Sequence, residues 1–141
     1  SILQGAKGLI DYVKQEQAEA PVIFGWSLGA AVALAIASGK SADWAPCVLI
    51  GVPFSSLRGM AMHLTMSTVA PVIWVVEHWP SQKRAAEIHL PILVMSASKD
   101  EFIPSEMHRE VYDAVRGTNK MLISEPVGHN EIFAFQPTSF L

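Results

Sequence analysis

The stretch Gly25-Trp26-Ser27-Leu28-Gly29 decides how the rest of this 141-residue sequence is interpreted. It follows a short apolar run that is typical of a buried strand and precedes an alanine-rich run that is typical of a helix. A serine between two glycines at such a turn is lifted clear of the sheet, and the next backbone amide points toward a developing oxyanion. The stretch predicts a nucleophile elbow with Ser27 as nucleophile and the Leu28 amide as an oxyanion donor. Because a five-residue match also arises by chance, the rest of the chain has to support it.

Composition limits the classes of protein to which the chain can belong. Half of its residues are hydrophobic, 16% are charged and the mean hydropathy is +0.30, which fits parallel strands buried on both faces. The formal net charge of −3 provides no basic surface, so we expect no nucleic-acid partner. The sequence contains none of the spacings typical of metal sites or phosphate-binding loops, so we expect no metal and no cofactor.

The hydrophobic pattern predicts alternating helices and strands in an α/β fold. Helices are expected at 2–17, 28–38 and 106–116, strands at 22–24, 47–52, 92–97 and 120–124, and the start of a final helix at 131–135. Ser105 and Gly117 are expected to cap the helix at 106–116. This alternation implies a mostly parallel sheet with helices on both faces.

One segment departs from the alternation within a single domain that spans residues 1–141. Residues 55–90 are rich in methionine and tryptophan and are only loosely patterned. Apolar segments of this kind often cover active sites, so we interpret 55–90 as a lid-like insertion. Packing of the same residues on the sheet is the equal alternative, because methionine commonly fills gaps in cores.

A serine hydroxyl needs a base to take its proton and an acid to orient that base. Asp100 closely follows the predicted strand at 92–97, and His129 follows the last predicted strand. Both would emerge at the carboxyl edge of the sheet, where Ser27 also emerges. We therefore predict Ser27 as nucleophile, Asp100 as orienting acid and His129 as general base.

Other residues offer alternatives to this triad. Aspartate is common in turns, so Asp100 could serve only as a turn residue, and the adjacent Glu101 offers a second carboxylate. The remaining histidines lie in the insertion or in predicted helices, where a solvated or packed histidine is the usual outcome; they are His63, His78, His89 and His108. A triad with another acid and a catalytically inactive relative are the competing interpretations.

These motifs resemble the α/β-hydrolase superfamily from the helix before Ser27 to the loop after His129. Residues 85–95 followed by 99–104 are similar to the serine-aminopeptidase-like branch, and residues 128–131 are similar to the histidine loop of Bem-type membrane-anchored serine hydrolases. The resemblance implies a serine hydrolase that cleaves an ester, thioester or amide of a small-molecule or acylated substrate through an acyl-enzyme. It also implies an intracellular or membrane-associated location.

One departure from the family pattern concerns the strands that precede the first helix. In the family these strands supply the second oxyanion donor. They have no match here, so we expect an N-terminally truncated chain. Association with a membrane through the missing upstream part is left open. The strand at 22–24 would then have an unpaired apolar edge. We expect the 141 residues alone to be poorly active and to self-associate. The alternative interpretation, from a different functional class, is a non-catalytic binding or scaffold module with the same fold.

Overall fold

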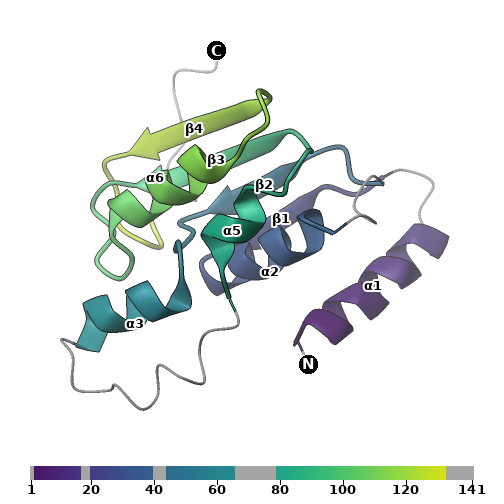
Figure 1. Cartoon of the computed structure of the whole chain (residues 1–141), viewed down its shortest axis with the longest axis horizontal. Helices are drawn as coiled ribbons and strands as arrows, with labels where there is room; N and C mark the ends of the chain where they lie inside the picture. Colours follow the sequence, from purple (N-terminus) through teal and green to yellow (C-terminus); the bar gives the residue numbers. More distant parts are fainter. Residues whose placement is uncertain (1, 17–19, 40–43, 66–78, 133–141) are drawn as a thin grey trace.

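The computed structural model of this chain describes residues 2–16, 20–39, 44–65 and 79–132 (Figure 1). In chain order the elements are α1 (Ile2–Glu16), β1 (Ile23–Trp26), α2 (Leu28–Ala37), β2 (Val48–Gly51), α3 (Leu57–Thr65), α5 (Ser81–Ala85), β3 (Ile92–Ala97), α6 (Ser105–Ala114) and β4 (Lys120–Glu125). The expected strands and the helices expected at 2–17, 28–38 and 106–116 are present, with ends within two residues of the expected ones, whereas α3 and α5 lie in the 55–90 segment, for which no helix bounds were predicted. The last described residues, 131 and 132, lie in a turn, and 133–135 of the expected final helix lie outside the described residues.

The four strands form one parallel sheet in the order β1-β2-β3-β4. Ile23 pairs with Val48, and Val48 pairs in turn with Ile92. Because all four strands run in the same direction, their carboxyl ends meet at one edge of the sheet (Figure 1). The segments that follow β1, β3 and β4 therefore leave the sheet at this shared edge, and they contain the three predicted catalytic residues.

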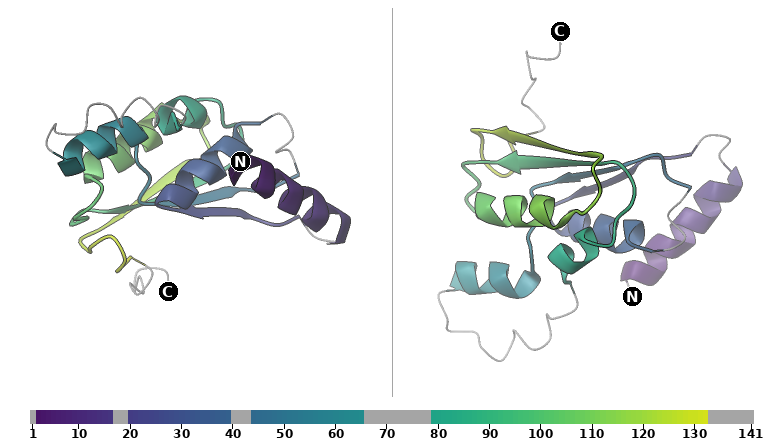
Figure 2. Two further views of the ribbon diagram at one scale, coloured as in Figure 1. Left: turned by 90° about the horizontal axis from the view of Figure 1, so that it is seen from below. Right: turned by 45° about the horizontal axis from the view of Figure 1, so that its top comes forward.

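One face of the sheet carries the main core. The strand residues on that face are buried, among them Val48, Ile50 and Val94, each 0% exposed. Helices α2, α5 and α6 pack over them in one cluster, so the described helices provide the expected cover on one of the two faces of the sheet (Figure 2). On the other face, Ile132 from the loop after β4 packs against Val52 and Ala97.

The close approach of α2 to β1 depends on Gly25. A Cβ atom at Gly25 would lie 2.3 Å from the carbonyl oxygen of Gly29 and 2.6 Å from the Cβ of Ala33. Only a residue without a side chain fits between the strand and the helix at that point. At Gly29, in contrast, a Cβ atom would meet nothing within 4 Å among the described residues. Steric crowding therefore excludes a side chain at Gly25 and does not exclude one at Gly29.

The expected caps of α6 are wrong. Ser105 is the first residue of the helix, and Pro104 occupies the N-cap position without a side-chain cap. Pro104 fixes the extended backbone that leads into the helix, which leaves the serine inside the first turn. The helix ends at Val115, which is extended, and no glycine in the described part of the chain has a positive φ. Gly117 therefore lies beyond the helix end and does not form a left-handed cap.

The described parts of 55–90 pack against the rest of the domain. Ala85 in α5 and the following Ile88 belong to the main core, while Leu57 and Met60 in α3 pack around Phe54. Residues 66–78 lie outside the described residues, so a lid role for 55–90 stays a prediction. Among the helices that the structure describes, none has the length and apolar character needed to cross a membrane.

Substitution of Gly25 tests the close packing of β1 and α2. We expect Gly25→Ala to lower the free energy of unfolding by about 1–3 kcal/mol or more, because the added methyl group meets backbone that cannot easily move. Gly29→Ala is the matched control, since open space surrounds it and alanine favours helices. Chemical denaturation measures both. Equal effects of the two substitutions would contradict the packing argument.

Candidate active site

Ser27 occupies the turn between β1 and α2 in a strained backbone conformation, with φ 51° and ψ −115°. A positive φ is unfavourable for a residue with a side chain, and such strain is concentrated at functional sites. Two hydrogen bonds hold the turn. The amide of Ser27 donates to the carbonyl of Gly51 over 2.9 Å, and the amide of Ala30 donates to the carbonyl of Ser27 over 3.0 Å. The sheet and the helix together therefore impose this conformation on the serine.

Leu28 is the first residue of α2. The first backbone N–H groups of a helix have no acceptor within the helix, and the helix dipole places partial positive charge there. The Leu28 amide is therefore next to Ser27 and at the end of α2 that favours negative charge. The Leu28 side chain itself is 48% exposed.

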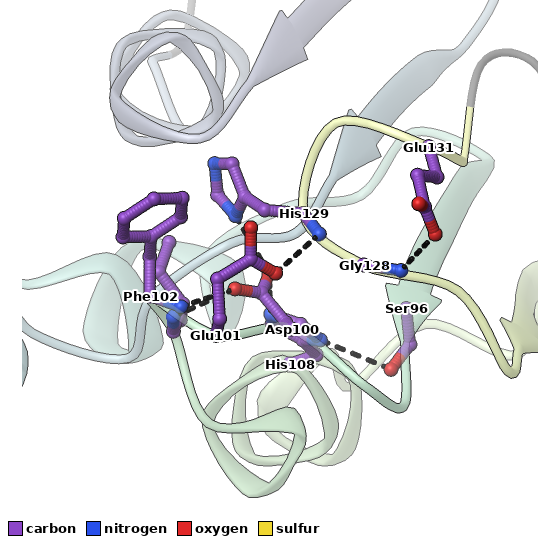
Figure 3. A network of polar contacts seen from close by, with 9 residues as sticks. Ser96, Asp100, Glu101, Phe102, His108, Gly128, His129 and Glu131 are labelled. Atoms are coloured by element: carbon purple, nitrogen blue, oxygen red, sulfur yellow. Dashed lines mark hydrogen bonds and ion pairs between the residues drawn. The ribbon is translucent and has the colours of Figure 1, made fainter.

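Asp100 lies in the turn after β3, and its side chain is fully buried (Figure 3). One carboxylate oxygen, Oδ1, accepts the amides of Phe102 at 2.9 Å and Ile103 at 2.8 Å. The other oxygen, Oδ2, lies 2.7 Å from Nδ1 of His129. Backbone donors thus fix the carboxylate on one side while it holds the imidazole on the other.

His129 lies in the loop after β4, between two aromatic side chains. The rings of Trp26 and Phe102 meet it edge to face, with ring centroids 5.6 Å and 5.3 Å away. The indole of Trp26 packs over Gly51, where a Cβ atom would lie 2.3 Å from the ring. Because Trp26 directly precedes Ser27, these contacts bring the histidine ring to the segment that carries the serine.

Carboxylates also hold the backbone of the histidine loop. Oε2 of Glu101 accepts the amide of His129 at 3.1 Å, and Oε2 of Glu131 accepts the amide of Gly128 at 2.9 Å (Figure 3). The adjacent carboxylates Asp100 and Glu101 therefore act on the same histidine in different ways. Asp100 contacts its ring and Glu101 its main chain, a distinction that the sequence left open.

His108 and Ser96 complete the site and were not expected there. His108 lies in α6 and is 0% exposed, with Nδ1 3.0 Å from Oγ of Ser96 and Nε2 3.5 Å from Oδ2 of Asp100. Burial lowers the pKa of His108 to about 4, against the opposing effect of Asp100. His108 and Val111 are three residues apart on the buried face of α6, and this helical spacing is the signal that could have indicated an inward position.

Two further observations define the limits of the site. No group of three or more histidine, cysteine, aspartate or glutamate side chains in the described part of the chain is arranged to hold a metal ion.

An apolar groove of about 450 Å³ lies at the opposite edge of the sheet, where it is lined by Cys47, Pro91 and Asn119 among others. The groove borders the beginnings of the strands, so it is separate from the residues around Asp100.

Comparison with solved structures identifies the fold. The chain aligns with an esterase of Pyrococcus furiosus at a TM-score of 0.71 and 18% identity, covering 94% of this chain and 55% of that one. It aligns with a monoacylglycerol lipase of Paleococcus ferrophilus at a TM-score of 0.65 and 17% identity, covering 90% and 66%. The chain therefore has the C-terminal portion of an α/β-hydrolase fold.

Sequence comparison finds curated relatives that are longer than this chain. An uncharacterized protein of Mycobacterium tuberculosis is 31% identical over 110 residues, which are 77% of this chain and 37% of that protein. An uncharacterized membrane protein of Saccharomyces cerevisiae is 31% identical over 113 residues, covering 78% and 39%. No family model matches the chain. The chain thus spans less than two fifths of the length of these relatives.

The buried His108 predicts how stability depends on pH. Its pKa falls from 6.5 to about 4 in the folded protein, so between these values the unfolded chain binds a proton that the folded chain does not. The free energy of unfolding should therefore fall as the pH is lowered through this window, by at most about 3 kcal/mol from this group. His108→Met should flatten that part of the curve in denaturation experiments at a series of pH values. Parallel curves for the two proteins would contradict the assignment.

Proposed function

We propose that this protein is a serine hydrolase in which Ser27, His129 and Asp100 form a catalytic triad. The observation that carries the proposal is the contact of 2.7 Å between the buried Asp100 carboxylate and Nδ1 of His129. The strained turn of Ser27 supports it, because a nucleophile elbow requires this kind of strand-to-helix geometry. All three residues also follow strands that end at the same edge of the sheet.

The proposed reaction is acyl transfer to Ser27 followed by hydrolysis. Because Nδ1 of His129 faces Asp100, Nε2 is the nitrogen left to take the proton from the Ser27 hydroxyl. The serine oxygen then bonds to the acyl carbonyl carbon, and the Leu28 amide stabilises the oxyanion. His129 returns the proton to the leaving group as its bond to carbon breaks. Water, activated by the same nitrogen, then releases the acid and restores Ser27.

Esters, thioesters and amides all react in this way. Fold relatives that are described as an esterase and a monoacylglycerol lipase favour an acyl ester over an amide. We also propose that the chain belongs to the serine-aminopeptidase-like branch and resembles its Bem-type members, on the strength of residues 85–95, 99–104 and 128–131. The membrane protein of Saccharomyces cerevisiae among the relatives supports a membrane-associated location, and an acylated substrate would be accessible there.

A fluorophosphonate probe tests the nucleophile. It reacts with an activated serine, so the full-length protein should be labelled and Ser27→Ala should not be. Ser38→Ala is a matched control, because Ser38 lies at the far end of α2 and its hydroxyl contacts the helix backbone. Labelling that survives Ser27→Ala would reject Ser27 as the nucleophile, and wild-type protein that stays unlabelled while folded would reject the triad in favour of a non-catalytic binding module.

Asp100 and Glu101 can be separated by isosteric amides. Asp100→Asn should lower kcat by about four orders of magnitude, because the amide favours the wrong tautomer of the histidine. Glu101→Gln should lower kcat by about tenfold or less, because its amide oxygen can still accept the His129 backbone N–H. Steady-state ester hydrolysis measures both. A larger loss in Glu101→Gln than in Asp100→Asn would identify Glu101 as the functional acid.

A further inference from the structure

The triad leaves one buried polar group in the site unexplained. Nε2 of His108 has no hydrogen-bond partner in the described part of the chain. It lies 3.5 Å from Oδ2 of Asp100, the same oxygen that His129 contacts at 2.7 Å. Asp100 therefore lies between two imidazoles that come from different elements, one in α6 and one in the loop after β4 (Figure 3).

The surroundings of His108 select one tautomer of its ring. If Nε2 carries the hydrogen, the N–H dipole faces the Asp100 carboxylate and Nδ1 is free to accept the Ser96 hydroxyl, 3.0 Å away. In the other tautomer, a lone pair on Nε2 would face the carboxylate across 3.5 Å in a buried site, which is repulsive. The Asp100 charge therefore favours the tautomer in which Ser96 donates to Nδ1 of His108 and the hydrogen on Nε2 lies on the carboxylate side of the ring, with Nε2 3.5 Å from Oδ2 and without forming a hydrogen bond.

We propose that His108 is a positioning residue, a second histidine whose Nε2–H stabilises the Asp100 charge and so sets how tightly the Asp100–His129 pair holds its proton. This inference rests on the proposed function of the triad. His108 acts on the reaction only through Asp100, since its buried ring in α6 contacts the carboxylate and Ser96.

His108 can perform this role because it stays neutral. The charged and titratable groups that act on it are Asp100 after β3, His129 after β4 and Glu106 on its own helix. Burial outweighs them and lowers the pKa of His108 to about 4, so the ring is uncharged at neutral pH. A neutral donor supports the carboxylate without competing with His129 for the role of imidazolium. Without that donor the Asp100 charge is less stabilised by its surroundings, and its attraction to a protonated His129 is stronger.

Two substitutions of similar length test the proposal in the full-length protein. His108→Gln keeps an N–H donor near the position of Nε2, whereas His108→Met fills similar space without one. We expect His108→Met to move the acidic limb of the kcat/KM profile upward by at most about one pH unit, because the lost contact is an N–H dipole at 3.5 Å and is weaker than a full hydrogen bond to a charged acceptor. His108→Gln should restore most of the shift, and KM should change in neither variant.

Controls separate this role from a structural one. His89→Gln changes an exposed histidine before β3, at the opposite end of that strand, and should leave the limb in place. Rates are normalised to the fraction of sites labelled by the fluorophosphonate, so loss of folded protein does not affect the limb. The proposal would be overturned if the acidic limb of the kcat/KM profile stayed in place in His108→Met, or if the methionine and glutamine variants shifted it equally.

A readout without turnover keeps the proposal distinct from the proposed function. The pH midpoint at which the His129 ring takes up its proton can be followed by NMR in wild type and in both variants. An upward shift in His108→Met alone supports the role of His108 even if the wild-type protein cleaves no ester. A midpoint that is equal in all three proteins would reject it even if the triad proves active.

Discussion

The buried carboxylate of Asp100 is the constraint on which the rest of the site depends. Removing an ionised carboxylate from water is expensive unless hydrogen bonds and opposite partial charges replace the solvent. Two backbone amides donate hydrogen bonds to Oδ1, and their positions require the tight turn between β3 and Pro104. Two imidazoles lie at Oδ2, and they require α6 and the loop after β4 to approach the same point. One charge therefore determines how three segments of the chain are placed.

Backbone strain is stored at the carboxyl ends of two neighbouring strands. Ser27 and Val52 are the only non-glycine residues with positive φ in the described part of the chain, and they directly follow the adjacent strands β1 and β2. Hydrogen bonds to the neighbouring strands hold both, from Ser27 to Gly51 and from Val52 to the carbonyl of Met95. Val52 is β-branched and fully buried, so packing maintains a conformation that its own side chain disfavours. The surrounding structure therefore maintains strained backbone at the carboxyl edge of the sheet, where a nucleophile would need to be preorganised.

The sequence predicted the four strands and helices α1, α2 and α6, because these depend on local hydrophobic pattern, but it predicted no bounds for α3 and α5. Chain order also placed Asp100 and His129 at the same edge of the sheet, and the structure brings the two side chains into contact. The strand Ile92–Ala97 has the predicted limits, since an apolar run between Pro91 and polar residues leaves no other choice. The caps of α6 were wrong because Pro104 and the Asp100 turn determine where that helix begins. Contacts such as that from Glu101 to the backbone of His129 cross 28 residues of sequence, and no periodicity encodes them.

The two histidines at Asp100 show how environment divides roles between identical side chains. His108 is a buried residue of α6 that contacts Ser96 of β3, and desolvation there lowers its pKa to about 4 and keeps it neutral. His129 is carried on a loop, reaches the same carboxylate oxygen at the shorter distance of 2.7 Å, and contacts aromatic edges rather than a helix interior. In the proposed triad His129 gains and loses a proton while His108 stays neutral; the closer contact with the charge suits the first role and the deeper burial suits the second. The arrangement around Asp100 meets both requirements with a single carboxylate.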